Sequence, residues 1–449
     1  MKVGVLWMLL LFVVASCTKP NPAVCCVSED DCNAIGLDAV RECGDGLVCI
    51  KNECELPTTC LQDADCAEPT PFCDPGHGCV ECLQSGQCPA DRPVCDLSSN
   101  LCTTCSADDE CASSVCDSTA GTCLPESDVL YVSTGGPEAG LCERSNPCAL
   151  IHAVAVSGPG RNTVKLASGA YTATVSVIDK PLVIHGVGAT VTAPTSSYAF
   201  RVENAGRLRL EGLTVVSLVS NQSPIRCENA TTATPRLELY SMKTDAMGAG
   251  VLGLVCDMTI ERSVIVGRNQ GFLLYLVSST AVVDRSAFQG TSQSGSSLSA
   301  SSSMVQITNS TLTGLRGVND GFEGGPFDIS FSTLVDSTLT CGSPGTTTSS
   351  KFDSLVFYNS RSDAPSSTIT GTCDIHYSVV FPQFGQVGPT NVTGLQPHLR
   401  DVAAGDYHLE SSSPAVDRGN PASTLSIDFE GTPRPQGGVR DSGAFEFRP

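Results

Sequence analysis

Residues 208–215 read LRLEGLTV, and the same pattern returns seven times, the last copy being CDIHYSVV at residues 373–380. The pattern is apolar, any, apolar, two of any kind, small or apolar, any, apolar. Its second apolar position falls at Leu210, Leu239, Ile260, Val283, Ile307, Ile329, Phe352 and Ile375. The steps between these repeat markers are 29, 21, 23, 24, 22, 23 and 23 residues. A repeat this regular indicates one structural unit copied along the chain.

Apolar residues alternate inside each copy and then skip by three, which predicts a strand, a corner and a second strand. A unit of about 22 residues cannot bury its apolar side alone, whereas stacked copies give each unit a neighbour. The sequence therefore predicts a parallel β-helix, in which Leu208 with Leu210 and Leu237 with Leu239 point inward and stack as ladders. A leucine-rich repeat has a similar period, but its asparagine-anchored consensus is missing.

The composition fits an extended solenoid. Aromatic residues make up 5% and charged residues 16% of the 449 residues, which is less than helical domains usually contain. The net charge is −21, and residues 18–127 alone hold 20 acidic and 4 basic residues, a net of −16. Because the sequence contains no basic stripe, we expect no nucleic-acid partner.

The amino terminus resembles a lipoprotein signal. Residues 3–14 form an apolar run that is too short to span a bilayer but suits the core of a secretory signal. The following VASC, residues 14–17, resembles a bacterial lipobox, which implies that residues 1–16 are removed and Cys17 is lipidated. Thr18 replaces the aspartate that favours inner-membrane retention in that family. The resemblance implies an outer-membrane lipoprotein, at the cell surface or facing the periplasm. An ordinary signal peptide is the alternative.

Residues 25–124 form a cysteine-rich segment, which residues 17–24 would tether to the lipid. The segment holds 18 of the 25 cysteines, and from residue 60 they fall into modules of four, the first being Cys60, Cys66, Cys73 and Cys79. Their apolar content is too low for a core, so we expect disulfides, although spacing does not fix the connectivity. The modules resemble acidic cysteine-rich repeats of surface lipoproteins from myxobacteria-like Gram-negative bacteria, and we interpret them as a stalk.

A zinc site is the alternative for two pairs of these cysteines. Cys79-x2-Cys82 and Cys102-x2-Cys105 lie nineteen residues apart, which matches a four-cysteine zinc site. Each pair joins the last cysteine of one module to the first cysteine of the next, and export favours oxidation. We therefore favour disulfides and expect no metal here.

The solenoid is expected to begin near residue 128. Residues 129–136 read VLYVSTGG, residues 166–175 read LASGAYTATV, and a short helix is expected at residues 149–156, ended by a Gly-Pro pair. Together these segments resemble the amino-terminal end of bacterial right-handed β-helix proteins of the pectate-lyase-like superfamily. The resemblance implies an all-β, right-handed parallel β-helix over residues 128–400, and it implies little about chemistry.

Three disulfides are expected in this region. The first would staple the loop before the helix. The cysteines of the second lie seventeen residues after neighbouring repeat markers, and strands about 4.8 Å apart are within the reach of a disulfide. The third pair is chosen by elimination only. The expected pairs are Cys142–Cys148, Cys227–Cys256 and Cys341–Cys373.

The residue after each repeat marker should point outward and stack as one strip: Glu211, Tyr240, Glu261, Asp284, Thr308, Ser330, Asp353 and His376. Glu261 and Asp284, with the adjacent Arg262 and Arg285, could form an acid/base pair or a calcium site. Glu261, Asp284 and Arg285 are therefore the best catalytic candidates. A surface ladder of ion pairs is the simpler interpretation, and we favour it.

The motifs of familiar enzymes on this fold are missing. The sequence has neither the Gly-Asp-Asp and Gly-His-Gly motifs of polygalacturonases nor the Arg-x-Pro-x-x-Arg of pectate lyases. Serines such as Ser263 and Ser286 recur at the corners without a histidine in register. We interpret them as structural corner residues.

Residues 401–449 break the repeat and resemble the terminal motif of the choice-of-anchor Q family. The resemblance lies in SPAVD at residues 413–417, Arg434-Pro435 and DSGAFE at residues 441–446. That family usually has its anchor at the carboxyl terminus, whereas here we expect it at the other end. Arg434 could fork onto Asp428 or Asp441, which favours a structural cap. A calcium site is the alternative, and its ligands would be Asp417, Asp428 and Asp441; no other cofactor is expected.

These features favour a non-enzymatic surface lipoprotein, in which a disulfide stalk presents a β-helix that binds glycans or cell-surface partners. The alternative is a polysaccharide lyase or glycoside hydrolase that acts on the face of the β-helix. The sequence does not identify the ligand.

The lipid anchor can be tested by Cys17→Ser. We expect the variant to appear in the soluble fraction, because the signal run alone is too short to hold the protein in a bilayer. Fractionation of cells followed by immunoblotting measures this, with Cys148→Ser as a control for the loss of a cysteine. Unchanged membrane association of the Cys17→Ser variant would contradict the prediction.

Overall fold

The computed structural model comprises two compact units, Met1–Cys123 and Leu124–Pro449. Side chains are described at residues 60, 62–74, 76–195, 197–220, 222–231, 233–268, 271–290, 297–315, 326–339, 350–360, 369, 373–382 and 388–449. The backbone alone is described at residues 48–50, 53–55, 322–324, 340 and 370. The lipidation candidate Cys17 lies outside the described residues.

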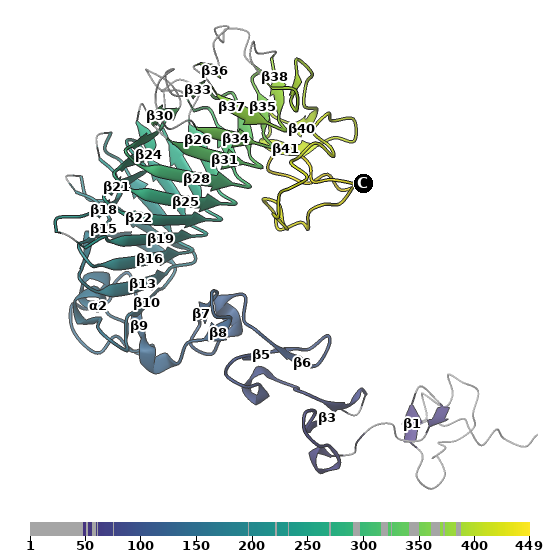
Figure 1. The fold of residues 1–449 in the computed structure, drawn as a ribbon. Helices are drawn as coiled ribbons and strands as arrows, with labels where there is room; N and C mark the ends of the chain where they lie inside the picture. Colours follow the sequence, from purple (N-terminus) through teal and green to yellow (C-terminus); the bar gives the residue numbers. More distant parts are fainter. Residues whose placement is uncertain are drawn as a thin grey trace, which may run out of the picture. The chain divides into compact units, whose positions relative to one another are not determined.

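Within residues 60–123 of the first unit, three modules have the same shape (Figure 1). Each module is a 3₁₀ helix followed by an antiparallel hairpin. The helices are η1 (Asp63–Asp65), η2 (Ser85–Gln87) and η3 (Asp108–Glu110). The hairpins are β3 (Phe72–Asp74) with β4 (Gly78–Val80), β5 (Val94–Asp96) with β6 (Leu101–Thr103), and β7 (Cys116–Asp117) with β8 (Thr122–Cys123). Another hairpin, β1 (Val48–Ile50) with β2 (Glu53–Glu55), precedes them.

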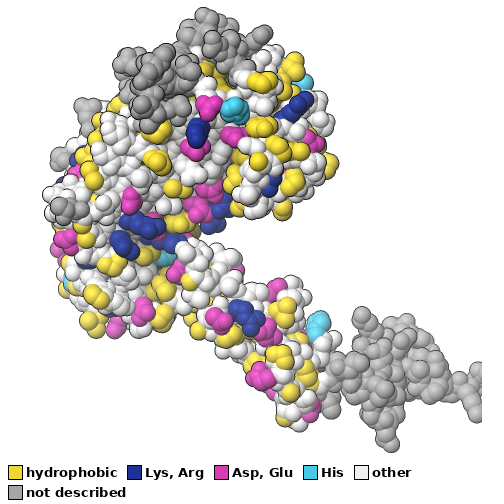
Figure 2. All heavy atoms as spheres, viewed as in Figure 1, with side chains coloured by type: hydrophobic (Ala, Val, Ile, Leu, Met, Phe, Trp, Pro, Cys, Tyr) yellow, Lys and Arg dark blue, Asp and Glu magenta, His cyan; other side chains and the backbone are white. Residues whose placement is uncertain are grey.

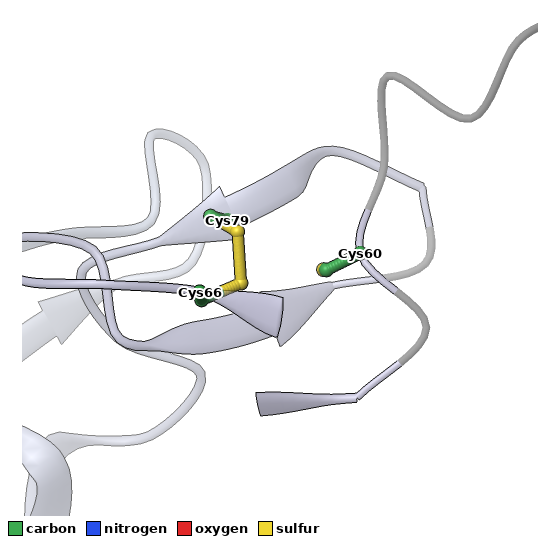
Figure 3. Close-up of side chains that lie close together, drawn as sticks. All are labelled: Cys60, Cys66 and Cys79. Carbon is green, nitrogen blue, oxygen red and sulfur yellow. A yellow bond between two sulfur atoms is a disulfide. The ribbon is translucent and has the colours of Figure 1, made fainter. Parts of the chain in front are cut away.

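Two disulfides close each module by joining the first cysteine to the third and the second to the fourth. The pairs are Cys60–Cys73, Cys66–Cys79, Cys82–Cys95, Cys88–Cys102, Cys105–Cys116 and Cys111–Cys123. Figure 3 shows the bond between Cys66 and Cys79, with Cys60 beside it. Each bond joins residues 11 to 14 apart and stabilises its module by about 3 kcal/mol through the unfolded chain.

The zinc alternative is therefore not supported. The four cysteines that it needs, Cys79, Cys82, Cys102 and Cys105, belong to four different disulfides. A cysteine in a disulfide has no thiolate to offer a metal.

The second unit is a parallel β-helix built from three sheets (Figure 1). Sheet 1 consists of β9 (Val129–Val132), β10 (Thr163–Leu166), β13 (Pro181–His185), β16 (Arg207–Glu211), β19 (Arg236–Tyr240), β22 (Asp257–Glu261), β25 (Thr280–Asp284), β28 (Met304–Thr308), β31 (Phe327–Ser330), β34 (Lys351–Asp353) and β37 (Asp374–His376).

Sheet 2 consists of β11 (Gly169–Thr172), β14 (Ala189–Thr192), β17 (Thr214–Ser217), β20 (Lys243–Ala246), β23 (Val264–Gly267), β26 (Ala287–Gly290), β29 (Thr311–Thr313), β32 (Thr333–Val335), β35 (Val356–Tyr358), β38 (Val379–Phe381) and β39 (Val392–Thr393). Sheet 3 consists of β12 (Val175–Ile178), β15 (Phe200–Glu203), β18 (Ile225–Glu228), β21 (Val251–Leu254), β24 (Phe272–Val277), β27 (Ser297–Ser301) and β30 (Phe322–Gly324). A short pair, β33 (Leu339–Thr340) with β36 (Ile369–Thr370), is separate.

The register between neighbouring strands of sheet 1 aligns the repeat markers. Leu210 pairs with Leu239, which pairs with Ile260, and the column continues through Val283, Ile307, Ile329, Phe352 and Ile375. All of these side chains are buried. Burying one such side chain contributes about 1.5 to 3 kcal/mol, so the column forms a continuous aliphatic core. The predicted parallel β-helix is confirmed.

A residue in the left-handed backbone region turns the chain at each corner between sheets 1 and 2. It lies two positions after the repeat marker and has φ between 46° and 73°: Gly212, Ser241, Arg262, Arg285, Asn309, Phe331, Ser354 and Tyr377. Only the first is a glycine, so the others adopt a conformation that L residues rarely populate. This corner is the physical cause of the three-residue skip in the sequence repeat.

Buried serines bond the backbone N–H groups at these corners. The Ser286 hydroxyl accepts a hydrogen bond from the Ser263 N–H (3.1 Å) and donates one to the Asp284 carbonyl (2.9 Å). In the same way, the Ser310 hydroxyl accepts a hydrogen bond from the Ser286 N–H (3.1 Å). These serines are less than 2% exposed, so they are structural residues and not accessible nucleophiles.

Helix α2 (Leu150–Val156) covers the amino-terminal end of the β-helix, as expected from the sequence. It buries Leu150, Ala153 and Val154 and packs against β9, β10 and β12. The Lys180 ammonium donates hydrogen bonds to the Val154 carbonyl (2.5 Å) and the Ser157 hydroxyl (2.9 Å). Lys180 therefore satisfies a carbonyl at the end of the helix that has no partner within the helix.

A loop protects the free edge of β9. Tyr131 donates its N–H to the Cys142 carbonyl (2.8 Å), and its own carbonyl accepts the Cys148 N–H (3.0 Å). Cys142 and Cys148 form a disulfide, as paired from the sequence. The loop therefore supplies the hydrogen bonds that an exposed strand edge would offer to another chain.

Cys227 and Cys256 also form a disulfide, but they do not occupy equal positions in neighbouring turns. Cys227 is the register partner of Gly253. The link from β17 to β18, residues 218–224, is three residues longer than the link from β20 to β21, residues 247–250, which explains the difference. Position 253 has no room for a larger residue, since a Cβ on Gly253 would lie 2.7 Å from Leu276 Cδ2.

The third pair lies partly outside the described residues. Cys373 is disulfide-bonded, whereas Cys341 is not among the described residues. The Cys341–Cys373 pair therefore stays a prediction.

The carboxyl-terminal segment packs against the outer face of sheet 2, beside its last strands (Figure 1). It contains the hairpin of β40 (Leu399–Asp401) and β41 (Asp406–Leu409). Ala444 donates its N–H to the Thr333 hydroxyl (2.9 Å), and Leu409 and Ala415 form an apolar cluster with Val356 and Val379. The segment is therefore a cover on the side of the coil, which explains why this part of sheet 2 is apolar on both faces.

The serine ladder can be tested by Ser286→Ala. The Ser263 N–H would lose its acceptor while staying buried, so we expect a loss of about 1 to 3 kcal/mol in the free energy of unfolding. Urea denaturation followed by circular dichroism measures this loss. Ser301→Ala, at an exposed position of β27, is the matched control and should leave the midpoint unchanged. Equal midpoints for the two variants would contradict the structural role.

Candidate functional site

The outward strip on sheet 1 forms as predicted. Glu211 pairs with Tyr240, Tyr240 with Glu261, and Glu261 with Asp284. The register continues through Thr308, Ser330, Asp353 and His376. The strip places acidic side chains on neighbouring strands, where they would repel each other without a cation.

Arg285 lies between the two carboxylates of the catalytic candidates. Its Nη2 is 2.5 Å from Glu261 Oε1, and its Nε is 2.8 Å from Asp284 Oδ2. Asp284 Oδ1 accepts hydrogen bonds from the Thr308 hydroxyl (2.8 Å) and the Asn309 amide (3.2 Å). Arg285 is a corner residue, and its left-handed backbone lies beside both partners. The structure therefore brings the three candidates together.

This arrangement is an ion-pair ladder. Glu261 is also 3.3 Å from Arg262 Nε, so two guanidinium groups contact its carboxylate. A general base needs a free lone pair directed at a substrate proton, and a general acid needs a proton to give. Here a guanidinium group contacts an oxygen of each carboxylate, so a substrate would first have to displace Arg285. The described geometry agrees with the simpler interpretation of the sequence.

A second feature of sheet 1 was not predicted from the sequence. Arg207 and Arg236 are register partners on β16 and β19, so two guanidinium groups extend from neighbouring strands. Arg236 Nε is 2.7 Å from Glu238 Oε1. The structure records no acidic partner for Arg207 among the described residues. Stacked like charges destabilise a sheet unless an opposite charge lies nearby.

The two arginines line a groove of about 210 Å³ with Pro181, Val183, Arg209 and Glu238. The Arg209 guanidinium lies 4.1 Å from the centre of the Tyr240 ring and 3.0 Å from Glu211. Figure 2 shows Lys and Arg side chains gathered over this part of sheet 1. We name this surface the arginine groove. The available sequence signal was an arginine three residues before each of two successive repeat markers, Leu210 and Leu239.

The carboxyl-terminal segment is organised around Arg434, whose side chain is fully buried. Its Nη1 is 3.1 Å from Glu446 Oε2, and it donates hydrogen bonds to the carbonyls of Asp441 (2.9 Å) and Gly443 (2.8 Å). The expected fork onto the carboxylate of Asp428 or Asp441 is therefore wrong. Glu446 is the carboxylate partner of Arg434, and its two oxygens also accept hydrogen bonds from the N–H groups of Gln436 and Asp441.

The three proposed calcium ligands do not present free carboxylates to one point. Each accepts hydrogen bonds from the backbone: Asp417 from Val439, Asp428 from Glu430, Thr432 and Glu446, and Asp441 from Asp417 and Phe447. Among the described residues, the groups that bring three ligand atoms within 4.8 Å of one another consist of cysteines. The aspartates here stabilise turns.

Burial shifts the protonation of this network. It raises the pKa of the Asp441 carboxyl to about 6, although two backbone N–H groups act in the opposite direction. Burial also lowers the pKa of Arg434. The segment therefore contains a carboxyl group that titrates in the mildly acidic range.

The geometry defines the chain as a parallel β-helix protein with a disulfide-rich amino-terminal unit. No family model and no curated protein sequence matches it. Among solved structures, the crystal structure of pectate lyase Pel9A is similar, with 15% identity and a TM-score of 0.47. The similarity covers 71% of this chain and 96% of that chain. No helix among the described residues is long and apolar enough to cross a membrane.

The titration of Asp441 can be tested by Asp441→Asn. The wild-type carboxyl has a pKa of about 6 when folded and about 3.8 when unfolded. The folded state then binds the proton more tightly, so stability from this group is complete below pH 3.8 and is lost as pH rises through 6. The asparagine does not titrate, so we expect the deficit of the variant to be about 1 to 2 kcal/mol larger near pH 4.5 than near pH 7.5.

Urea denaturation at the two pH values measures this difference. Glu410→Gln, which changes an exposed carboxylate of the same segment, is the control and should show no such trend. A deficit that shrinks at low pH would mean that the backbone N–H groups outweigh burial and that the pKa of Asp441 is lowered.

Proposed function

We propose that this chain is a surface lipoprotein that binds an anionic glycan through the arginine groove. The observation that carries the proposal is the pair of Arg207 and Arg236 in register on neighbouring strands, one of them without an acidic partner among the described residues. A carboxylate or sulfate on the ligand would supply the missing opposite charge, since guanidinium groups bind such anions through paired hydrogen bonds.

The shape of the surface also supports a chain-like ligand. The groove lies on a sheet whose strands repeat at about 4.8 Å, so its polar groups recur along the axis of the coil. Tyr240, held under the Arg209 guanidinium, adds an aromatic surface beside the groove. Placing the binding surface on a rigid sheet reduces the entropy lost on binding.

A polysaccharide lyase or hydrolase is the second candidate. It is favoured by the position of Glu261, Asp284 and Arg285 on the same sheet, one and two strands beyond β19. A substrate that extends from the arginine groove along the strip would reach them. Catalysis would require the substrate to displace Arg285 from at least one carboxylate.

The test is isothermal titration calorimetry of the full-length protein with uronate-containing, sulfated and neutral polysaccharides. We expect binding to the anionic chains, weakening as salt rises from about 0.05 to about 0.5 M. The double variant Arg207→Gln, Arg236→Gln should lose at least about tenfold in affinity, because each charged hydrogen bond contributes about 1.5 to 3 kcal/mol. Unchanged binding by this variant, or no binding to any anionic chain, would contradict the proposal.

Lys243→Gln is the matched control, because Lys243 is exposed on sheet 2, away from the groove. Incubation of the wild type with the same polysaccharides, with and without calcium, separates the second candidate. Release of product that disappears in the variant with Ala at 261, 284 and 285 would establish the enzymatic alternative.

A further inference from the structure

A separate cavity of about 700 Å³ lies at the amino-terminal end of the β-helix. Its walls come from η4 (Glu126–Asp128), β9, the loop stapled by Cys142–Cys148, and the turn before β10. Cavities of about 300 to 1,000 Å³ are typical of small-ligand sites. The volume therefore fits one or two rings of a small ligand.

Arg161 fixes one wall of this cavity. Its guanidinium donates hydrogen bonds to the carbonyls of Leu141 (2.7 Å), Val129 (2.9 Å) and Cys142 (3.3 Å). It thus joins the edge strand β9 to the stapled loop. A wall tied by three hydrogen bonds and a disulfide loses little freedom when a ligand binds, which favours binding.

The charged groups of the cavity balance one another. Two guanidinium groups, on Arg144 and Arg161, face two carboxylates, on Glu126 and Glu143. Arg144 Nη1 lies 2.9 Å from Glu126 Oε1. Tyr131 and Leu141 add apolar surface. The cavity therefore has little net charge, in contrast to the arginine groove.

We infer that this cavity binds a neutral, hydroxyl-rich ligand, namely one or two sugar residues. A sugar hydroxyl both donates and accepts, so neighbouring hydroxyls can pair with a carboxylate and a guanidinium at the same time. The apolar face of a sugar ring can pack against Leu141, which is 68% exposed, whereas Tyr131 is mostly buried. A small anion or cation would bind less favourably, because the cavity holds both carboxylates and guanidinium groups. The ion would be repelled by one kind while it is attracted by the other.

The site is independent of the proposed function, and salt distinguishes the two. Binding of an anion at the arginine groove weakens as salt rises, whereas binding of a neutral sugar in the cavity depends little on salt. The same protein should therefore show two classes of carbohydrate binding.

The test uses the full-length protein and saturation-transfer NMR titrations with glucose, galactose, mannose, N-acetylglucosamine and their β-linked dimers. We expect at least one of these sugars to bind, with an affinity unchanged between about 0.05 and about 0.5 M salt. Glu143→Gln should weaken this binding at least about tenfold, since a hydrogen bond to a charged acceptor is lost. Glu138→Gln, an exposed glutamate of the same loop that does not line the cavity, is the matched control.

The outcomes separate this site from the groove. The double variant Arg207→Gln, Arg236→Gln should bind neutral sugars as the wild type does. The inference is overturned if no neutral sugar binds the wild type, if Glu143→Gln and Glu138→Gln bind equally well, or if the double variant loses neutral-sugar binding. Because Glu143 is exposed, its substitution is expected to preserve the fold, which circular dichroism checks.

Discussion

In-register parallel pairing between successive turns is the constraint on which the rest of this structure depends. It places Leu210, Leu239 and Ile260 in one buried column, and a slip of one residue would turn the whole column toward solvent. The corners follow from the same constraint. Because the strands of successive turns are in register, every turn must bend at the same position, two residues after its repeat marker. Buried serines such as Ser286 then supply the hydrogen bonds that the corner backbone lacks.

The same register stacks side chains of like charge on the outer face of sheet 1. The effect of this stacking differs between the acidic pair and the arginine pair. Glu261 and Asp284 are stacked, but Arg285 lies between them and offsets their charge. Arg207 and Arg236 are also stacked, and among the described residues only Arg236 has an acidic partner. The same strand pairing therefore produces a charge-balanced ion-pair ladder at Glu261 and Asp284. At Arg207 and Arg236 it produces a surface suited to an anion. The difference lies in the neighbouring side chains and not in the fold.

The ends of the β-helix are protected in two ways. At the amino-terminal end, α2 and the stapled loop cover the edge of β9 and create the cavity beside Arg161. Near the other end, the carboxyl-terminal segment covers the side of sheet 2 through Leu409, Ala415 and Ala444, and the buried pair of Arg434 and Glu446 holds the segment together internally. Breaking such a pair costs about 3 to 5 kcal/mol, because the remaining charge stays buried. Both proposed binding surfaces lie in the amino-terminal half of the coil.

The sequence alone determined the solenoid and its outward strip, because a repeated unit records its own register in the spacing of its apolar residues. It also paired Cys227 with Cys256 correctly, but from an assumed equal position in neighbouring turns that the structure does not show. It could not assign the disulfides of the modules, which depend on which sulfur atoms the hairpins bring together. It also misassigned the partner of Arg434, since only the tertiary structure shows that the Glu446 carboxylate lies beside the Arg434 guanidinium. The arginine groove and the cavity beside Arg161 were likewise decided by the tertiary structure. They combine residues from separate turns and loops, and their charge balance depends on distances that the order of residues does not contain.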